Sequence, residues 1–180
     1  KAILNVEGNF LPNLDYETCF NRGIHILTAA PAFAKPVAEC ALAFALDLAR
    51  GITQADRDFR NGIEQYGLLG NHDTFSLVGK EIGLIGLGNL GRALLPFLTP
   101  FQCSIRVFDP WLPKGTIREL GCTPCDLDEI LTCSRVIFIL AAVTEENQGF
   151  IGRREFRLVQ PGSIVLLMSR AEVVDWEAFL

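Results

Sequence analysis

The sequence predicts an α/β chain built on a doubly wound parallel sheet, and three observations support this prediction. From residue 78 onward, short apolar runs with strand character alternate with helical segments. Strands separated by helices pair in parallel through right-handed crossovers. The first of these runs ends in a glycine-rich turn, Gly86-Leu-Gly88-Asn-Leu-Gly91. The composition agrees, because 180 residues that are 49% hydrophobic and 21% charged suffice to bury a core.

The alternation after residue 78 predicts each element in turn. The strands are runs of Ile, Val, Leu and Phe, and glycine, proline or aspartate marks the turns between them. We expect strands at 81–87, 104–108, 122–123, 136–140 and 163–168. We expect helices at 90–101, 115–120, 127–132 and 154–158.

Three segments divide the chain. Residues 1–36 hold two apolar runs around a helical stretch at 15–21, which is typical of the end of an α/β unit. Residues 37–77 hold a helix expected over 37–52, then a polar short helix and an exposed loop. Because that first helix is apolar on nearly every face, we expect it to be buried between domains or subunits. Residues 78–180 form the third segment. Both ends look cut, so we expect a fragment of a longer chain.

Composition and charge exclude several classes of protein. Disorder requires low hydrophobicity, and collagens and coiled coils require a strong compositional bias. The net charge of −5 leaves no basic stripe to neutralise phosphates, so we expect neither a nucleic-acid nor a membrane partner. No helix candidate reaches the roughly 20 apolar residues that span a bilayer, and no secretion signal opens the sequence. These observations favour a cytoplasmic protein.

Cysteines and histidines offer few candidates for chemistry. Cys122-Thr-Pro-Cys125 has the CxxC spacing of zinc and redox sites, but no second pair or well-spaced histidine accompanies it. We therefore expect no metal, and interpret the six cysteines as buried or half-buried thiols. The two histidines, His25 and His72, are the only candidates for a histidine acid or base within the sequence.

The glycine turn at 86–91 is the motif with chemical meaning. Glycine permits the tight turn and the close approach of backbone to a pyrophosphate, and the following helix directs its N–H groups and positive dipole end at the phosphates. A lone GxGxxG is weak evidence, but this one follows an apolar strand and opens a helix, as a dinucleotide site requires.

Asp109 ends the next expected strand, 18 residues after Gly91. A carboxylate there can accept both hydroxyls of the adenosine ribose and would repel a 2′-phosphate, which favours NAD over NADP. The alternative is an aspartate that caps the turn at Pro110. Arg106 points away from Asp109 on the alternating strand, so we do not expect it to bind a 2′-phosphate.

These residues carry a resemblance to a known family. Ordered matches run through 78–91, Asp109-Pro110, 127–131, 144–151, Pro161-Gly162, Ser169-Arg170 and Val174-Asp175. In order and spacing they are similar to the D-isomer-specific 2-hydroxyacid dehydrogenases. Residues 21–24 and 37–39 resemble the end of that family's substrate domain and its interdomain helix, so the resemblance covers most of the chain.

The resemblance implies a Rossmann-like NAD-binding domain with part of a flavodoxin-like substrate domain, and a homodimer formed through residues 37–76. It implies hydride transfer between the nicotinamide C4 and the 2-carbon of a hydroxy or keto acid. Phosphoglycerate, glyoxylate and hydroxypyruvate are the candidate types of substrate. The family's glutamate and histidine, which exchange the proton, lie downstream of Arg170, beyond Leu180, and neither His25 nor His72 matches them.

Individual residues follow from the same resemblance. Arg170 would be catalytic, gripping the substrate's carboxylate and keto oxygen as a planar bidentate cation; the alternative is an arginine paired with Glu172. Substrate binding is expected from Glu7, Gly8 and Arg170. NAD binding is expected from Gly86, Gly88, Asn89, Leu90, Gly91, Asp109, Ala141, Ala142, Thr144, Met168, Ser169 and Arg170.

Several departures from the family pattern concern the substrate side rather than NAD. Leu140-Ala141-Ala142 replaces a usual His-x-Pro, Leu167 replaces an asparagine, and Ala171 replaces a glycine. A second hypothesis is therefore an NAD-sensing regulatory or corepressor protein on the same fold, with little turnover. A relative of formate dehydrogenase is a weaker match, because that branch's substrate-side asparagine has no convincing counterpart.

Overall fold

The larger part of the protein is a five-stranded parallel sheet, as the alternation predicts. In the computed structural model, residues 1–6 and 13–179 are described. The strands are β3 (Glu81–Ile85), β4 (Ser104–Phe108), β5 (Thr123–Pro124), β6 (Val136–Ile139) and β7 (Ile164–Leu167), in the spatial order β5-β4-β3-β6-β7. The first strand is thus central and the order reverses beside it, which is the doubly wound arrangement.

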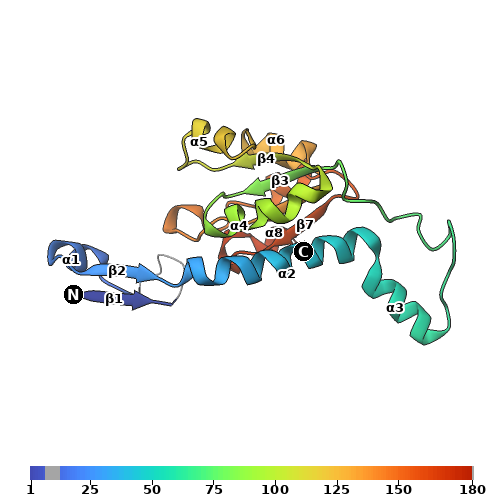
Figure 1. Ribbon diagram of the computed structural model, residues 1–180, viewed down its shortest axis with the longest axis horizontal. Coiled ribbons are helices and arrows are strands. Elements are labelled where there is room, and N and C mark those ends of the chain that lie inside the picture. The colour runs from blue at the N-terminus through green and yellow to red at the C-terminus, as the bar shows by residue number, and fades with distance from the viewer. Residues whose placement is uncertain (7–12, 180) are drawn as a thin grey trace.

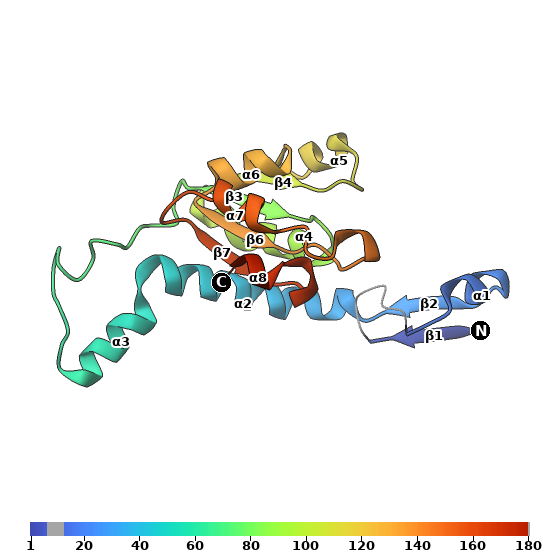
Figure 2. The ribbon, with the colours of Figure 1, turned by 180° about the vertical axis from the view of Figure 1, so that it is seen from behind.

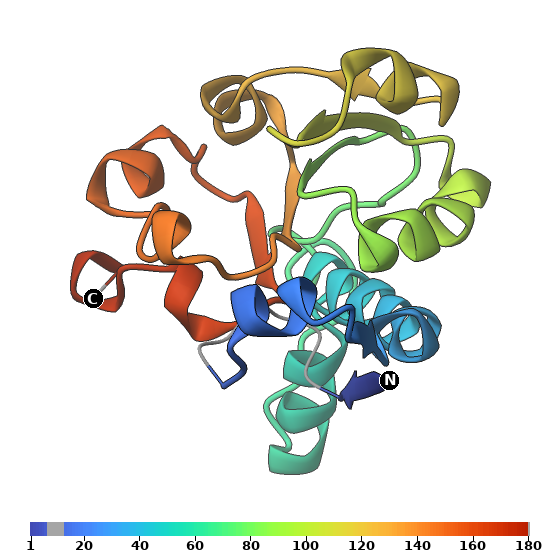
Figure 3. The same ribbon diagram turned by 90° about the vertical axis from the view of Figure 1, so that its left-hand side faces the viewer.

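Helices cover both faces of this sheet. They are α4 (Asn89–Leu98), α5 (Lys114–Glu119), α6 (Leu127–Cys133), α7 (Arg153–Leu158) and α8 (Trp176–Phe179), with 3₁₀ turns η1 (Thr99–Phe101), η2 (Glu145–Asn147) and η3 (Ala171–Val173). In Figure 3, lime-green α4 and blue-to-cyan α2 lie on one side of the sheet and orange α7 on the other. The predicted strands lie within two residues of the observed ones, and strand 81–87 ends at Ile85 because the glycine turn begins there. The predicted helices also agree within two residues, except that helix 90–101 is α4 followed by η1; η2, η3 and α8 are additional to the predicted elements.

The two faces of the sheet contribute to separate cores. Ile82 and Leu84 of β3 pack with Leu94 and Leu98 of α4, whereas Ile85 packs on the other side, in a cluster with residues of α6. Side chains alternate across a strand, so a strand buried on both faces reads as a continuous apolar run. The predicted strands are such runs, which is why their positions could be read from the sequence.

A long helix joins the sheet to the N-terminal segment, and it differs from the prediction. α2 spans Ala30–Arg50, not 37–52. Pro31 lies in the first turn, where a missing N–H costs nothing, and Pro36 lies inside the helix. The helix ends at Gly51, whose φ of 64° provides the left-handed cap, and α3 (Ile52–Asn61) then begins.

One face of α2 is buried, rather than nearly all of it. Alanines at three- and four-residue spacing are buried and form its contact with α4 and the sheet; they are Ala34, Ala38, Ala41, Ala45 and Ala49. Small side chains let the two helices approach closely. The opposite face carries Phe44 and Leu48, which remain 49% and 54% exposed.

A small N-terminal unit lies at one end of α2. β1 (Ala2–Asn5) and β2 (His25–Thr28) pair in parallel, and α1 (Tyr16–Asn21) connects them. Figure 1 and Figure 2 show this unit at one end of the long axis and α3 at the other, with α2 running between them beneath the sheet. Among the described residues, the two apolar runs are thus strands and the stretch between them holds a helix, while residues from Ala30 onward belong to α2.

Among the described residues, none of the helices combines the length and hydropathy required to cross a membrane.

Candidate functional site

A cavity of about 950 Å³ lies at the carboxyl ends of β3, β4, β6 and β7. In an open α/β sheet, ligands bind where the strand order reverses, which here is between β3 and β6. The N-terminal end of α2 closes the cavity on another side. Most of the residues predicted from the sequence to bind the cofactor line it: Gly86, Gly88, Asn89, Leu90, Asp109, Ala141, Ala142, Thr144, Met168, Ser169 and Arg170.

Of the predicted site residues that the structure describes, Gly91 does not line the cavity. It packs beneath the glycine turn, where an added Cβ would lie 2.9 Å from the Gly86 carbonyl oxygen. Gly91 thus permits close packing of the helix against the turn. Glu7 and Gly8, expected on the substrate side, lie outside the described residues.

The first two motif glycines meet different physical demands. Gly86 has a φ of 98°, and a Cβ there would lie 3.0 Å from both the Cα and the N of Ala141. Gly88 has an ordinary φ of −74°, and a Cβ there would meet no heavy atom within 4 Å. Gly86 is therefore required by the fold, whereas Gly88 leaves open space at the start of α4 into which a phosphate can come close.

The first turn of α4 is available to an anion. The first N–H groups of a helix have no partner within the helix, and no side chain caps this one. Arg92 holds the turn in place, because its Nε donates to the Leu87 carbonyl oxygen at 3.2 Å. Uncapped N–H groups beside the space at Gly88 fit a pyrophosphate.

Asp109 caps a turn, as one of the two interpretations of the sequence expects, and it also contacts the glycine turn. Its Oδ1 accepts the N–H groups of Trp111 and Leu112 at 3.0 and 3.1 Å, so it does cap the turn at Pro110. Its Oδ2 accepts the Leu87 N–H at 2.8 Å, which ties the glycine turn to β4. A carboxylate has about four acceptor positions and three are used here, so Asp109, which lines the cavity, keeps acceptor capacity for a ligand hydroxyl.

The loop after β6 forms the wall opposite Asp109. Asn147 braces it: its Oδ1 accepts the Thr144 N–H at 2.8 Å and its Nδ2 donates to the Ala142 carbonyl oxygen at 2.7 Å. The Thr144 hydroxyl oxygen is buried and has no hydrogen-bond partner among the residues that the structure describes. A buried orphan hydroxyl on a cavity wall is a ready partner for a polar ligand atom.

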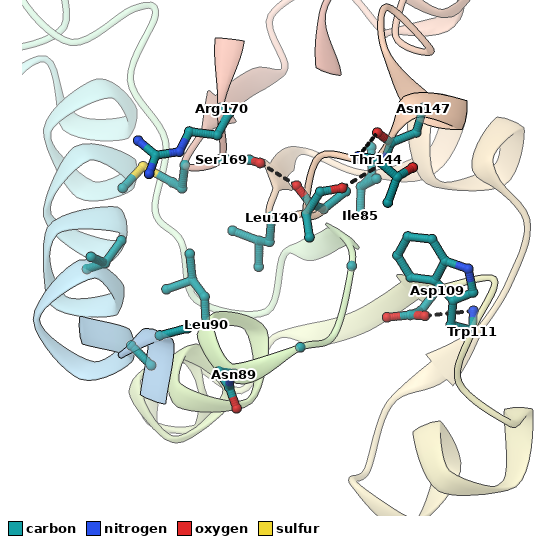
Figure 4. A pocket seen from close by; sticks show the side chains of 18 of the residues that line it. Ile85, Asn89, Leu90, Asp109, Trp111, Leu140, Thr144, Asn147, Ser169 and Arg170 are labelled. Carbon is teal, nitrogen blue, oxygen red and sulfur yellow. Dashed lines mark hydrogen bonds between the residues drawn. The ribbon is translucent and has the colours of Figure 1, made fainter. Parts of the chain in front are cut away.

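Arg170 follows β7 and lies on the side of the cavity nearer α2 (Figure 4). Its neighbour Ser169 donates a hydrogen bond from Oγ to the Ala141 carbonyl oxygen, which joins the segments after β6 and β7. Met168 lines the cavity just before them. The described lining contains three charged residues, Asp109, Glu146 and Arg170, so Arg170 is the one cation among the described residues that line the cavity.

Arg106 lies away from the cavity, as the alternation of β4 predicts. Its Nε is 2.9 Å from Glu81 Oε2, and its guanidinium also pairs with Glu129. The bond to Glu81 raises the pKa of the Arg106 guanidinium. This arginine is thus occupied in bracing the sheet.

The cysteines follow the prediction of buried or half-buried thiols only in part. All six are free thiols; Cys19 and Cys122 are buried and Cys103 and Cys125 are half-buried, whereas Cys40 and Cys133 are exposed, so the prediction is wrong for those two. Burial raises the pKa of the Cys125 thiol to about 11 and also raises that of Cys122. A reactive CxxC needs a lowered pKa, so this pair has the opposite property.

Some lining residues were missed in the sequence. Trp111, Asn147 and Phe33 line the cavity, but none belongs to a glycine motif or ends a predicted strand. The Thr144–Asn147 spacing of three is a capping pattern that could have identified Asn147. Trp111 follows Asp109-Pro110 directly, so its place beside the cavity could also have been inferred. No local signal identifies Phe33, because α2 brings it there from another part of the chain.

Comparison with known proteins agrees with this geometry. The family model for the D-isomer specific 2-hydroxyacid dehydrogenase NAD binding domain matches residues 42–180. The chain is 31% identical to D-3-phosphoglycerate dehydrogenase of Archaeoglobus fulgidus over 174 residues, which cover 96% of this chain and 32% of that protein. It is 29% identical to glyoxylate reductase of Thermococcus litoralis over 172 residues, or 93% and 52% of the two chains.

Solved structures show the same fold. A phosphoglycerate oxidoreductase from Rhizobium etli superposes with a TM-score of 0.85 at 45% identity, covering 99% of this chain and 57% of that one. D-lactate dehydrogenase from Aquifex aeolicus, crystallised with NAD and lactic acid, has a TM-score of 0.85 at 23% identity, covering 99% and 53%. The chain therefore spans about a third to a little over half the length of these relatives. With its glycine turn, Asp109 and the family match over 42–180, the chain belongs to the D-isomer specific 2-hydroxyacid dehydrogenases and contains their NAD-binding domain.

Proposed function

We propose that the protein transfers a hydride between NAD(H) and the 2-carbon of a D-2-hydroxy acid or 2-keto acid of the phosphoglycerate, glyoxylate or hydroxypyruvate type. One observation supports this most directly. Arg170 lines the same cavity as the glycine turn and Asp109, so a cation that can hold a carboxylate lies within the site that fits a dinucleotide. The names of the relatives, D-3-phosphoglycerate dehydrogenase and glyoxylate reductase, supply the range of substrates.

In this proposal each group has a defined task. The N–H groups at the start of α4 bind the pyrophosphate, and Asp109 accepts a ribose hydroxyl. NAD, when bound, accepts or supplies the hydride at C4 of its nicotinamide. Arg170 holds the substrate carboxylate and polarises the 2-oxygen, since a guanidinium presents parallel donors and stays charged. Met168 and Leu140 add apolar surface that excludes water.

Asp109 and its surroundings favour NAD over NADP. A 2′-phosphate would come close to the Asp109 carboxylate, and the other described acidic residue of the lining, Glu146, adds to the repulsion. Arg106, a cation on the same strand as Asp109, is occupied by Glu81 and Glu129. We infer that the adenosine end of the cavity accepts a ribose that carries no 2′-phosphate.

The test is turnover of 2-keto acids by the intact protein. Glyoxylate, hydroxypyruvate and phosphohydroxypyruvate would each be mixed with NADH, and the loss of reduced cofactor followed by absorbance. We expect at least one to be reduced. Arg170→Ala should lower kcat/KM about 100-fold or more, because one contact that stabilises charge on the substrate oxygen contributes a rate factor of about that size. The Kd for NADH should stay within about twofold of the wild type. Arg118→Ala, on the exposed surface of α5, is the matched control.

Two outcomes would separate the hypotheses. NADH binding without turnover of any keto acid would favour the NAD-sensing regulator over the enzyme. Normal turnover in Arg170→Ala would remove Arg170 from the mechanism. Neither His25 nor His72 lines the described cavity, and both are exposed, so replacing either with Ala should leave turnover unchanged.

We further propose a homodimer that covers the exposed apolar face of α2, α3 and the loop that follows. Phe44, Leu48, Ile52 and Phe59 are about half to two-thirds exposed, and Leu68 is 90% exposed. Contiguous exposed apolar surface commonly marks a protein–protein interface. Figure 1 shows α3 and the loop reaching away from the sheet, where a second copy has room to contact them.

We also propose a cytoplasmic location and a division into residues 1–36 of the substrate domain, 37–77 of the interdomain helix and dimerisation loop, and 78–180 of the NAD-binding domain. Six free cysteines suit a reducing compartment. Because α2 crosses the 36/37 boundary, it would act as a rigid link between the two domains.

A further inference from the structure

The exposed indole of Trp111 is not explained by the fold. Its side chain belongs to the cavity lining, yet the residue is 61% exposed. A large aromatic side chain left in water forfeits its hydrophobic stabilisation, unless a partner covers it. The protein's other tryptophan, Trp176, instead donates from Nε1 to the Ala171 carbonyl oxygen at 3.0 Å and contacts Phe179. Trp111 therefore differs from Trp176 in presenting its ring to the cavity.

The backbone beneath this indole is held firmly. Trp111 donates its N–H to Asp109 Oδ1 at 3.0 Å, and Leu112 donates to the same oxygen at 3.1 Å. Pro110 precedes Trp111, and Pro113 caps the start of α5, so ring constraints limit φ on both sides. A side chain on a pre-ordered turn loses little entropy when it binds a ligand.

The position of the ring relates it to one part of a dinucleotide. Figure 4 shows the indole beside the Asp109 carboxylate, on the side that faces Thr144 and Asn147. If Asp109 holds the adenosine ribose, the base attached to that ribose lies at this end of the cavity. The opposite loop contributes Ala141 and Ala142, whose small side chains offer a purine little surface.

We propose that the Trp111 indole is the adenine-binding platform of this cavity, stacking on the purine of NAD while Asp109 holds the attached ribose. The inference rests on the proposed function, because it assumes that the cavity binds NAD. Stacking on an indole is available to any purine, so the platform contributes to affinity for AMP, ADP-ribose and NAD alike. It contributes nothing to the choice between NAD and NADP, which depends on Asp109.

AMP is the probe that tests this directly, because it carries the adenine and ribose but no nicotinamide. With Trp176→Phe, Trp111 is the single tryptophan in the chain, and AMP binding should quench its fluorescence. Trp111→Ala should raise the Kd for AMP and for NAD about tenfold by calorimetry, the effect expected when one stacked base loses its aromatic partner. Trp111→Phe should stay within about threefold of the wild type, since a phenyl ring can still stack.

The controls separate stacking from misfolding and from failure of the proposed function. Trp176→Ala changes the other tryptophan and should leave the Kd for AMP unchanged. Because Trp111 is exposed, the Tm of Trp111→Ala should match that of the wild type. Wild-type affinity for AMP and NAD in Trp111→Ala would overturn the platform and leave the dehydrogenase proposal standing. Failure of the wild-type protein to bind either NAD or AMP would overturn both.

Discussion

Replacing two glycines of one turn with alanine should damage the protein in two different ways. At Gly86, alanine must adopt a φ of 98° and place its Cβ 3.0 Å from the Cα and N of Ala141. The backbone conformation costs about 1–2 kcal/mol for an L-residue, and forcing a methyl into a filled space costs about 1–3 kcal/mol more. Gly86→Ala should therefore lower the free energy of unfolding by about 2–5 kcal/mol.

At Gly88 the same substitution should leave the fold intact. Its φ of −74° suits any residue, and a Cβ there meets no heavy atom within 4 Å. The stability should stay within about 0.5 kcal/mol of the wild type. The methyl group would instead occupy space at the start of α4 that a pyrophosphate must enter. The Kd for NAD should therefore rise about tenfold or more, which corresponds to a loss of roughly 1.4 kcal/mol of binding free energy.

Thermal unfolding without cofactor, followed by calorimetric titration with NAD, measures both effects. For a chain of this length each kcal/mol shifts Tm by about 2–4 °C, so Gly86→Ala should melt about 4–20 °C lower and Gly88→Ala within about 2 °C of the wild type. Equal Tm values for Gly86→Ala and the wild type would refute the steric argument. A Gly88→Ala protein that binds NAD normally would refute the assignment of the phosphate site.

Three further predictions concern specificity, assembly and pH. Asp109→Asn keeps an acceptor for the turn's N–H groups but removes the charge, so the Kd for NAD should rise about tenfold and the preference over NADP should narrow; calorimetry showing an unchanged NAD/NADP ratio would contradict this. Phe44→Glu with Leu48→Glu should give a monomer in sedimentation, whereas Phe20→Glu, an exposed apolar residue of α1, should not; a double variant that remains dimeric would place the interface elsewhere. Since the folded Cys125 thiol has its pKa raised from 9.0 to about 11, the unfolded thiol ionises first, and stability should fall as pH rises from about 9 toward 11. Cys125→Ser should show a shallower fall in urea unfolding over that range, and parallel curves would refute the linkage.

The local pattern of apolar residues was sufficient to predict the positions of most strands of the sheet. β3 and β6 are buried on both faces and read as unbroken apolar runs, so their positions followed from composition and periodicity alone. α2 was misjudged at its start, because Pro31 and Pro36 suggest a boundary in sequence. Pro31 is tolerated in the first turn, and burial of the alanine face against α4 stabilises the helix enough to hold Pro36.

The candidate site divides in the same way. The glycine turn and Asp109 lie at strand ends, so their convergence follows from parallel strands with their carboxyl ends together. The bracing by Asn147 and the exposed position of Trp111 depend on how two loops fold back on themselves, which side-chain hydrogen bonds decide. Phe33 reaches the cavity because α2 packs across the sheet, and the residues adjacent to Phe33 in the sequence do not predict that contact.

The sequence by itself determined the order of strands and helices, the dinucleotide turn and the carboxylate that accompanies it, because each depends on residues close together in the chain. Only the tertiary structure decided that Asp109 also ties its own turn to the glycine turn, that Gly86 is held by Ala141 while Gly88 faces open space, and that an indole stands beside the cavity. The physical reason is distance along the chain: these contacts join segments after different strands, and packing of the whole sheet brings them together.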